Sequence, residues 1–407
     1  LASHLTKSLD RPVLLVTAEQ SGMYHLLDDL NFFLHEEPVD VLVYPHPEVL
    51  PYEAQEPELT VRLERMLVLR QAWENWWKKD APRRPTIAVT CVAALLKRGL
   101  HPSKFPEQAL EFKVGAVADP DAAKQWLVEE GYEFRELVSR RGDFSTRGGI
   151  IDVYPLSYPE AVRIEFFGDE VDSIRTFDVS TQRSVSRIDK VSLLPSNEDF
   201  LIARAFQHDD HPLVDYLTDL LPDPVVLLDE PEQIENEAEN YYRLVERGYE
   251  EALDGQDDEE VVLGEEQIHR HERYLLSPPN EIYTSPSDFM QNCRTIGAVP
   301  LTEFALPPEP GNYNCDTQPI EFSTDDTTDR LKHLVNRSVE GRKVFVICDN
   351  KGQEDRFKEM TTSAIKNLHL PDDSTQPQTL IGTINHGFSV SSLNLDIITD
   401  REVFGRY

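Results

Sequence analysis

The first 118 residues alternate between short apolar runs and amphipathic segments. Continuous apolar runs at 11–18 (RPVLLVTA), 39–45 (VDVLVYP) and 85–91 (PTIAVTC) predict three strands that are buried on both faces. Between these runs, residues 23–34 and 59–77 carry apolar side chains at helical spacing, which predicts two helices. Strands and helices that alternate in this order indicate a parallel sheet covered by helices.

A different pattern, with a period of two residues, runs from residue 142 to 178 (GDFSTRGGIIDVYPLSYPEAVRIEFFGDEVDSIRTFD). It predicts a small antiparallel meander with strands at 144–155, 161–167 and 170–178. Within the first strand, the glycine pair 148–149 predicts a bulge or a strong twist. A short helix is expected just upstream, at 118–134, because an Asp-Pro entry and a closing glycine mark its two ends. We therefore expect residues 119–194 to form an inserted α+β domain.

The α/β pattern resumes after this insert. VVLLDEP (225–231) predicts one more buried strand, followed by a long helix, so residues 1–118 and 195–312 are expected to form two parts of one domain. A proline-rich connection then leads to a small, separate α/β domain at 320–407. Its predicted elements are helices at 327–340 and 352–366 and strands at 343–350, 380–384 and 395–399.

Composition restricts the possible functions. The chain has 407 residues and a formal charge of −34, so its averaged field repels phosphate backbones and any contact with nucleic acid must be local. The four cysteines form no C-x-x-C pair, which disfavours a zinc site or a disulfide framework and fits a cytoplasmic protein. No apolar run is long enough to span a membrane. Because the chain starts at Leu1 rather than methionine, we expect it to be a fragment of a longer protein.

One segment resembles an ATPase motif. In VVLLDEP, four apolar residues precede Asp229 and Glu230, as in strands that hold Mg²⁺ and activate water in nucleotidases. A buried strand that ends in an acidic helix start gives the same pattern, because the helix dipole favours Asp and Glu there. The sequence contains no G-x-x-x-x-G-K-[ST] loop to bind the phosphates. We therefore expect no nucleotide cofactor and no catalysis from this chain.

Two other groups of residues have a composition that sites use. The histidine pairs 208/211 and 269/271 have no third ligand at a fixed spacing, so they give little support for a metal centre. Trp73, Trp76 and Trp77 recur at helical spacing, which favours packing in a core or a domain interface over stacking on nucleic-acid bases.

The predicted meander carries an unusual outer face. Strand alternation directs Val162, Ile164 and Phe166 to the core and places Arg163, Glu165 and Phe167 on the opposite side. One explanation is that the phenylalanine packs beneath a neighbouring loop or domain. The other is a protein-docking face, because arginine and aromatic side chains are enriched in interfaces and their hot spots.

The same stretch resembles a known family. RGDFSTRGGIIDVYP, followed by VRIEFFGDEVDSIRTFDVSTQRS, is similar to the UvrB-like module at the N-terminus of bacterial transcription-repair coupling factors (Mfd). Further similarity occurs at VYPHPEVLPYEAQEPE (43–58), at TCVAALLKR and at LDIITDREVFGRY. The resemblance extends over nearly the whole chain but is faint after residue 199, and the family's S-P is Glu56-Pro57 here.

The resemblance implies a partner and three contact residues. In this family the inserted domain imitates UvrB and binds the damage-recognition protein UvrA through two arginines and a phenylalanine. The matching motif positions here are Arg147, Arg163 and Phe167. They lead us to expect a module that recruits UvrA in nucleotide excision repair by docking, not catalysis.

The resemblance also implies an architecture, a degenerate helicase-like α/β domain without a P-loop, with a small α+β UvrA-binding domain inserted in it. RNA polymerase and DNA would be bound by parts of the parent protein beyond Tyr407. UvrB itself is disfavoured, because this chain lacks the P-loop and an aromatic cluster after LPYEAQEPE. Two alternatives remain open: an ATP-dependent DNA translocase subunit that uses Asp229 and Glu230, and a scaffold that serves as an autoinhibitory surface.

Overall fold

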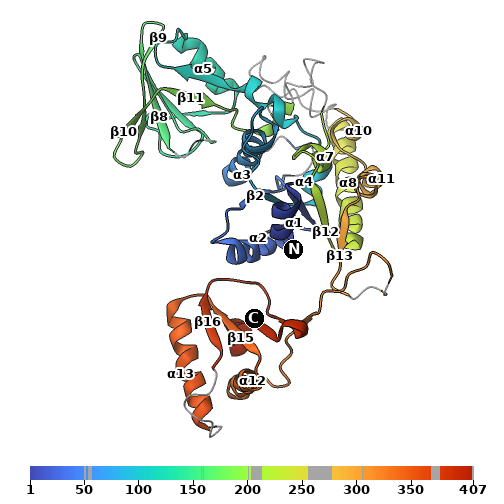
Figure 1. Ribbon diagram of the computed structural model, residues 1–407. Helices are drawn as coiled ribbons and strands as arrows, with labels where there is room; N and C mark the ends of the chain where they lie inside the picture. Colours follow the sequence, from blue (N-terminus) through green and yellow to red (C-terminus); the bar gives the residue numbers. More distant parts are fainter. Residues whose placement is uncertain are drawn as a thin grey trace. The chain divides into compact units, whose positions relative to one another are not determined.

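The fold was analysed in a computed structural model, shown in Figure 1. It describes residues 1–405 except 50–51, 54–56, 157, 159, 200, 203–212, 255–276, 305–306, 308 and 368–375. The chain divides into two compact units, one made of Leu1–Met23 and Pro38–Leu301, the other of Tyr24–Glu37 and Thr302–Tyr407. The histidines at 208, 211, 269 and 271 and the acidic loop at 255–260 lie outside the described residues.

The first unit contains a five-stranded parallel sheet with the order β13-β12-β1-β3-β2. Its central strands consist mostly of buried apolar residues, as the continuous apolar runs predicted. Parallel strands are covered on both faces, which explains why their sequences do not alternate. The strands are β1 (Val13–Thr17), β2 (Asp40–Tyr44), β3 (Thr86–Cys91), β12 (Val225–Asp229) and β13 (Val299–Leu301).

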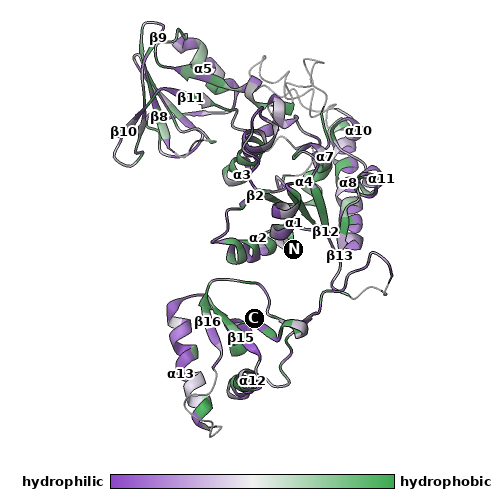
Figure 2. Cartoon of the chain, in the orientation of Figure 1, coloured by the Kyte–Doolittle hydropathy of each residue, from purple (hydrophilic) through white to green (hydrophobic). Residues whose placement is uncertain are grey.

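Amphipathic helices surround this sheet. The predicted helix at 59–77 is present as α3 (Leu59–Ala72), which continues into a π-helical turn, η1 (Trp73–Trp77). The tryptophans pack, as expected: the indole of Trp76 is buried and donates to Thr86, and that of Trp77 donates to the carbonyl of Leu220. Figure 2 shows the apolar strand β12 in green beside α8, whose residues alternate between polar and apolar.

The helices of the first unit are short apart from α3 and α8. Helix α8 (Pro231–Asp254) follows β12 directly, as the sequence predicted. Apart from α5, which belongs to the second sheet, the other helical segments among the described residues of this unit are α1 (Ala2–Leu9), the start of α2 (Gln20–Leu34), α4 (Val92–Leu96), η2 (Pro102–Gln108), α7 (Tyr216–Asp219), α10 (Pro279–Ile282) and α11 (Pro286–Ile296).

A second sheet of six strands lies between β3 and β12 in the sequence, with the order β10-β9-β8-β7-β6-β5. Helix α5 (Pro120–Glu129) packs on one face of it through Ala123 and Leu127. The N-cap residue Asp119 accepts a hydrogen bond from the amide of Asp121, so the helix starts where the Asp-Pro signal placed it. The strands are β5 (Glu133–Phe134), β6 (Asp143–Arg147), β7 (Ile150–Val153), β8 (Ala161–Phe167), β9 (Glu170–Phe177) and β10 (Ser184–Ile188).

The prediction of one strand over 144–155 was wrong. Strands β6 and β7 are separate and antiparallel, with Arg147 opposite Ile150, and the two glycines form the turn between them. Gly148 has φ of 59°, a left-handed value that glycine adopts without a steric penalty. A Gly-Gly pair between two strand-like runs is itself a hairpin signal, and the bulge interpretation gave it too little weight.

A two-stranded ribbon joins the two parts of the first unit. Strand β4 (Leu110–Lys113) runs antiparallel to β11 (Lys190–Leu193), so the chain enters and leaves the six-stranded sheet side by side. Phe112 and Val191 of this ribbon are buried in the core of that sheet. The ribbon therefore fixes both ends of the intervening segment at one place.

The second unit is a five-stranded mixed sheet with the order β14-β17-β18-β15-β16. The predicted elements are present as α12 (Thr327–Val339), β15 (Lys343–Cys348), α13 (Lys351–Asn367), β16 (Gln378–Ile381) and β18 (Leu395–Thr399). The short strands β14 (Thr317–Pro319) and β17 (Phe388–Val390) and the helix α14 (Asp400–Phe404) were not predicted. Residues 24–37, which include most of α2, belong to this unit, where Asp29 accepts from the amide of Asn385.

The observed fold is thus mixed α/β with a parallel sheet, as the sequence predicted. In the part of the chain that the structure describes, no helix is both long enough and apolar enough to cross a membrane.

Candidate docking face

The register of the six-stranded sheet determines which side chains share its outer face, the face away from α5. Residues directly opposite one another in an antiparallel pair project to the same side. Pairing across β6 to β10 therefore aligns one row of side chains: Ser145, Asp152, Arg163, Arg175 and Arg187. Three neighbouring positions in this row are arginines.

A second row contains the other predicted residues. Arg147 lies opposite Ile150, and Ile150 lies opposite Glu165. Phe167 is two residues beyond Glu165 on β8, so it projects to the same side. The structure thus places Arg147, Arg163 and Phe167 on one face of one sheet.

Phe167 is the most prominent side chain of this face. It ends strand β8, beside the turn at Gly168, and 85% of its surface is exposed. Its neighbour Phe166 points the other way, into the core, where its ring contacts Phe112 at 5.9 Å between centroids. The alternation predicted for VRIEFF is therefore confirmed at both phenylalanines.

Arg163 is held in place rather than free. Its Nε and Nη2 donate to the two carboxylate oxygens of Asp152, each at 2.7 Å, and its guanidinium lies 5.0 Å from the ring centroid of Phe177. The hydrogen bonds to Asp152 raise the pKa of Arg163, so the group stays charged. Only 21% of the side chain is exposed. Arg163 therefore reaches the outer face, as expected, but its guanidinium is paired with a carboxylate of the same sheet.

Arg147 is more open to solvent. It is exposed at the end of β6, and its Nη2 donates to the backbone carbonyl of Glu136 at 2.8 Å. This bond restrains the guanidinium without neutralising it, because the acceptor is a neutral carbonyl. Arg147 can therefore bring a full positive charge to a partner.

Part of the outer face is closed by the protein itself. Ala161 and Phe177, at one end of β8 and β9, are buried against Val138 from the segment before β6. Phe177 thus faces outward and not into the main core, and it is buried by this segment. The open area therefore begins at Arg163 and extends toward Phe167.

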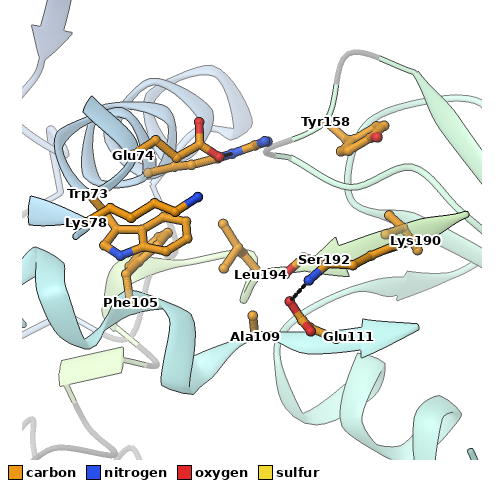
Figure 3. Close-up of a pocket in the computed structure, with 12 residues that line it drawn as sticks. Trp73, Glu74, Lys78, Phe105, Ala109, Glu111, Tyr158, Lys190, Ser192 and Leu194 are labelled. Carbon is orange, nitrogen blue, oxygen red and sulfur yellow. Dashed lines mark hydrogen bonds and ion pairs between the residues drawn. The ribbon is translucent and has the colours of Figure 1, made fainter. Parts of the chain in front are cut away.

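A cavity of about 280 Å³ lies elsewhere in the first unit, next to the ribbon (Figure 3). Trp73, Lys78 and Phe105 line one side of it, and Lys190 and Glu111 form an ion pair of 2.6 Å on the other. None of the three predicted contact residues lines this cavity.

The ATPase-like strand was also located. Asp229 ends β12, and burial, followed by the neighbouring Glu230, raises the pKa of its carboxyl group. Glu230 follows, and Pro231 starts α8. The acidic pair therefore lies at a helix start, where the helix dipole favours Asp and Glu, as the alternative to an ATPase motif predicted. Among the described residues, no group of three or more His, Cys, Asp or Glu is arranged to hold a metal ion.

A buried polar network anchors the chain where it leaves the ribbon. Arg65 of α3 and Glu198 form an ion pair with 2.6 Å between Nη2 and Oε2, and both side chains are almost completely buried. Tyr44 donates to the same carboxylate, and the guanidinium of Arg65 lies 4.0 Å from the centre of its ring. These contacts attach the segment after β11 to the parallel sheet.

Comparison with known proteins identifies the six-stranded sheet. Residues 110–198 match the UvrB interaction domain family. The chain is 26% identical to a transcription-repair-coupling factor of Myxococcus xanthus over 475 aligned residues, which cover 99% of this chain. The resemblance to transcription-repair coupling factors is confirmed. A second such factor, from Bacillus subtilis, is 35% identical over 197 residues, or 48% of this chain.

The chain is also similar to UvrB proteins. UvrABC system protein B of Thermosipho africanus is 28% identical over 198 residues, which cover 48% of this chain and 30% of that protein. The chain spans 38% of the length of the Myxococcus xanthus factor and 16% of the Bacillus subtilis one. The relatives are thus much longer than this chain.

Sequence reasoning missed three members of the outer face. Asp152, Arg175 and Arg187 are aligned with Arg163 only by strand register. The Gly-Gly hairpin signal would have separated β6 from β7, but the pairing of Asp152 with Arg163 depends on the register between β7 and β8. Strand β10 carries few apolar residues (SVSRI), so the sequence gave no comparable signal for Arg187.

Proposed function

We propose that this chain docks onto UvrA and thereby takes part in transcription-coupled nucleotide excision repair. The observation that carries the proposal is the common face of Arg147, Arg163 and Phe167. An exposed ring beside positioned guanidinium groups has the composition of an interface hot spot. The match of residues 110–198 to the UvrB interaction domain family supports the assignment of UvrA as the partner.

Charge supports a protein partner over nucleic acid. The outer face carries four arginines, at 147, 163, 175 and 187, against the three carboxylates of Asp152, Glu165 and Glu170. This local excess of positive charge lies on a chain with a net charge of −34. A carboxylate-rich protein surface fits such a patch, whereas a long phosphate backbone would also meet the repulsion of the whole chain.

We further propose that the parallel-sheet part is a degenerate helicase-like domain. Strand β1 ends at Thr17 and α2 begins at Gln20, so only Ala18 and Glu19 connect them. A phosphate-binding loop requires a longer glycine-containing turn with a lysine. This short connection supports a scaffold role, and contacts with RNA polymerase, DNA and ATP would then belong to other parts of the parent protein.

The proposed domain division is 1–118 and 195–312 for this domain, 119–194 for the inserted one and 320–407 for the small α/β domain, with residues 24–37 of the first range belonging to the second compact unit. Two observations support it. Strand β12 pairs directly with β1, which joins the two parts of the first domain in one sheet. The ribbon of β4 and β11 provides a single entry and exit for the insert.

Binding assays on the intact chain test the proposed function. Calorimetry with purified UvrA should give a saturable complex, and Arg147→Ala or Arg163→Ala should each weaken it by about 2 kcal/mol, as interface anchors do. Arg243, an exposed arginine on α8, provides a matched control as Arg243→Ala. Folded variants that bind UvrA as well as the wild type would reject the docking face.

A parallel assay separates docking from catalysis. The docking proposal predicts no ATP turnover by this chain, with or without DNA. ATP turnover that Asp229→Asn abolishes would instead support the translocase alternative.

A further inference from the structure

A short segment before α5 extends the outer face beyond β9. The amide of Gly115 donates to the carbonyl of Val171 at 2.8 Å, and the amide of Ala118 donates to that of Asp169 at 2.7 Å. Between these bonds, Val117 forms an antiparallel bridge with Glu170. The segment therefore pairs with the first residues of β9 as an additional short strand.

Register then places Val117 in line with Phe167. Phe167 lies opposite Glu170 across the β8–β9 hairpin, and Glu170 lies opposite Val117. Because opposite residues project to the same side, all three share the outer face. Neighbouring strands are about 4.8 Å apart, so the two apolar side chains emerge roughly 10 Å from one another, one on each side of Glu170.

The side chain of Val117 makes little contribution to the fold. It is 82% exposed, almost as much as Phe167. The neighbouring Ala118 packs against the core of the sheet, so the segment is attached by its backbone bonds and by alanine. A single exposed valine needs no explanation. Val117, however, lies in the same row as the proposed aromatic anchor. A partner that covers Phe167 would also cover Val117.

We propose that Val117 is a second apolar contact of the docking face, covered by the same partner protein that covers Phe167. This inference rests on the proposed function. The matching partner surface has an apolar area about 10 Å across, given the strand spacing. A hydrogen-bond donor would meet the carboxylate of Glu170 between the two apolar side chains, and carboxylates would meet the arginines.

Two substitutions at residue 117 test this contact in the intact chain. Val117→Asp places a charge in the apolar contact and should weaken UvrA binding by about tenfold or more. Val117→Thr keeps the β-branched shape and should cause a smaller loss, of about threefold. Val128→Asp is the control, since Val128 is exposed on α5, on the opposite side of the sheet. It should bind UvrA like the wild type.

Phe167→Ala, measured in parallel, separates the two claims. Loss of binding in Phe167→Ala together with wild-type affinity in both Val117 variants would overturn the inference and leave the proposed function in place. Wild-type affinity in Phe167→Ala and both Val117 variants would overturn both. Circular dichroism and thermal melting show whether each variant is folded. If Val117→Asp does not fold, the UvrA affinity of Val117→Thr tests the inference.

Discussion

Arg163 and Asp152 face one another across strands β7 and β8 and are joined by two hydrogen bonds of 2.7 Å. The guanidinium is also packed over Phe177, so its position is set before any partner arrives. An ordered side chain loses little conformational entropy on binding, which favours affinity. The ion pair therefore holds the proposed contact residue Arg163 in position.

Asp152→Asn tests this positioning role. The variant loses the charge that holds the guanidinium, and ordering one long side chain costs about 0.5–1.5 kcal/mol, so UvrA affinity should fall about two- to tenfold. Calorimetry measures the change, and Asp121→Asn on α5, on the other side of the sheet, is the control. Tighter binding by Asp152→Asn would mean that Asp152 competes with the partner for Arg163.

The buried pair of Arg65 and Glu198 should be essential for stability. Glu198→Gln leaves a buried guanidinium without its counter-charge, which typically costs about 3–5 kcal/mol of unfolding free energy. The surface pair of Arg70 and Glu74 is the control, because Glu74→Gln should cost less than about 1 kcal/mol. Denaturant titration measures both. Equal effects of the two substitutions would contradict the role assigned to the buried network.

His46 should make stability dependent on pH. Burial, with the charges of Arg65 and Lys97, lowers its pKa to about 3. The unfolded chain takes up this proton near pH 6.5, so the stabilisation is complete above that pH and is lost as the pH falls toward 3. His46→Gln should therefore reduce the decrease in unfolding free energy between pH 7 and pH 5. An unchanged slope in this variant would show that other groups cause the decrease.

The hairpin of β6 and β7 gives a prediction about two adjacent glycines. A Cβ at residue 149 would lie 2.7 Å from the carbonyl oxygen of Phe166, whereas one at residue 148 would have nothing within 4 Å. Gly149→Ala should therefore destabilise the sheet by about 1–3 kcal/mol. Gly148→Ala should cost about 1 kcal/mol, because only its left-handed φ is unfavourable. Thermal melting shows which of the two variants is less stable, and a larger loss of stability in Gly148→Ala would contradict this prediction.

Elements with a clear pattern of apolar residues were predictable from the sequence. The buried strands β1, β3 and β12 and the helices α3 and α8 lie where apolar runs and helical spacing placed them. Phe166 and Phe167 face opposite sides, as strand alternation required. These features depend on neighbouring residues, which a sequence shows directly.

Features that depend on distant pairing were not predictable. The ion pair of Arg163 and Asp152 and the row of Phe167, Glu170 and Val117 exist only through strand register. The buried pair of Arg65 and Glu198 joins residues 133 positions apart. The packing of residues 24–37 with the second unit is a further example, because no local signal indicates it. Strand alternation alone raised Arg163 and Phe167 as part of a docking face, and the motif match added Arg147 and the partner; the role of all three stays a proposal.

The most direct test of the docking face compares two exposed phenylalanines of the same sheet. Phe167 lies on the outer face, while Phe134, 58% exposed, pairs with Phe144 on the core-facing side. The measurement is the dissociation constant for UvrA of Phe167→Ala and Phe134→Ala, each confirmed as folded. A docking role for Phe167 predicts that Phe167→Ala weakens binding by about 2 kcal/mol or more and that Phe134→Ala leaves it unchanged. Wild-type affinity of Phe167→Ala, or an equal loss in both variants, would contradict it.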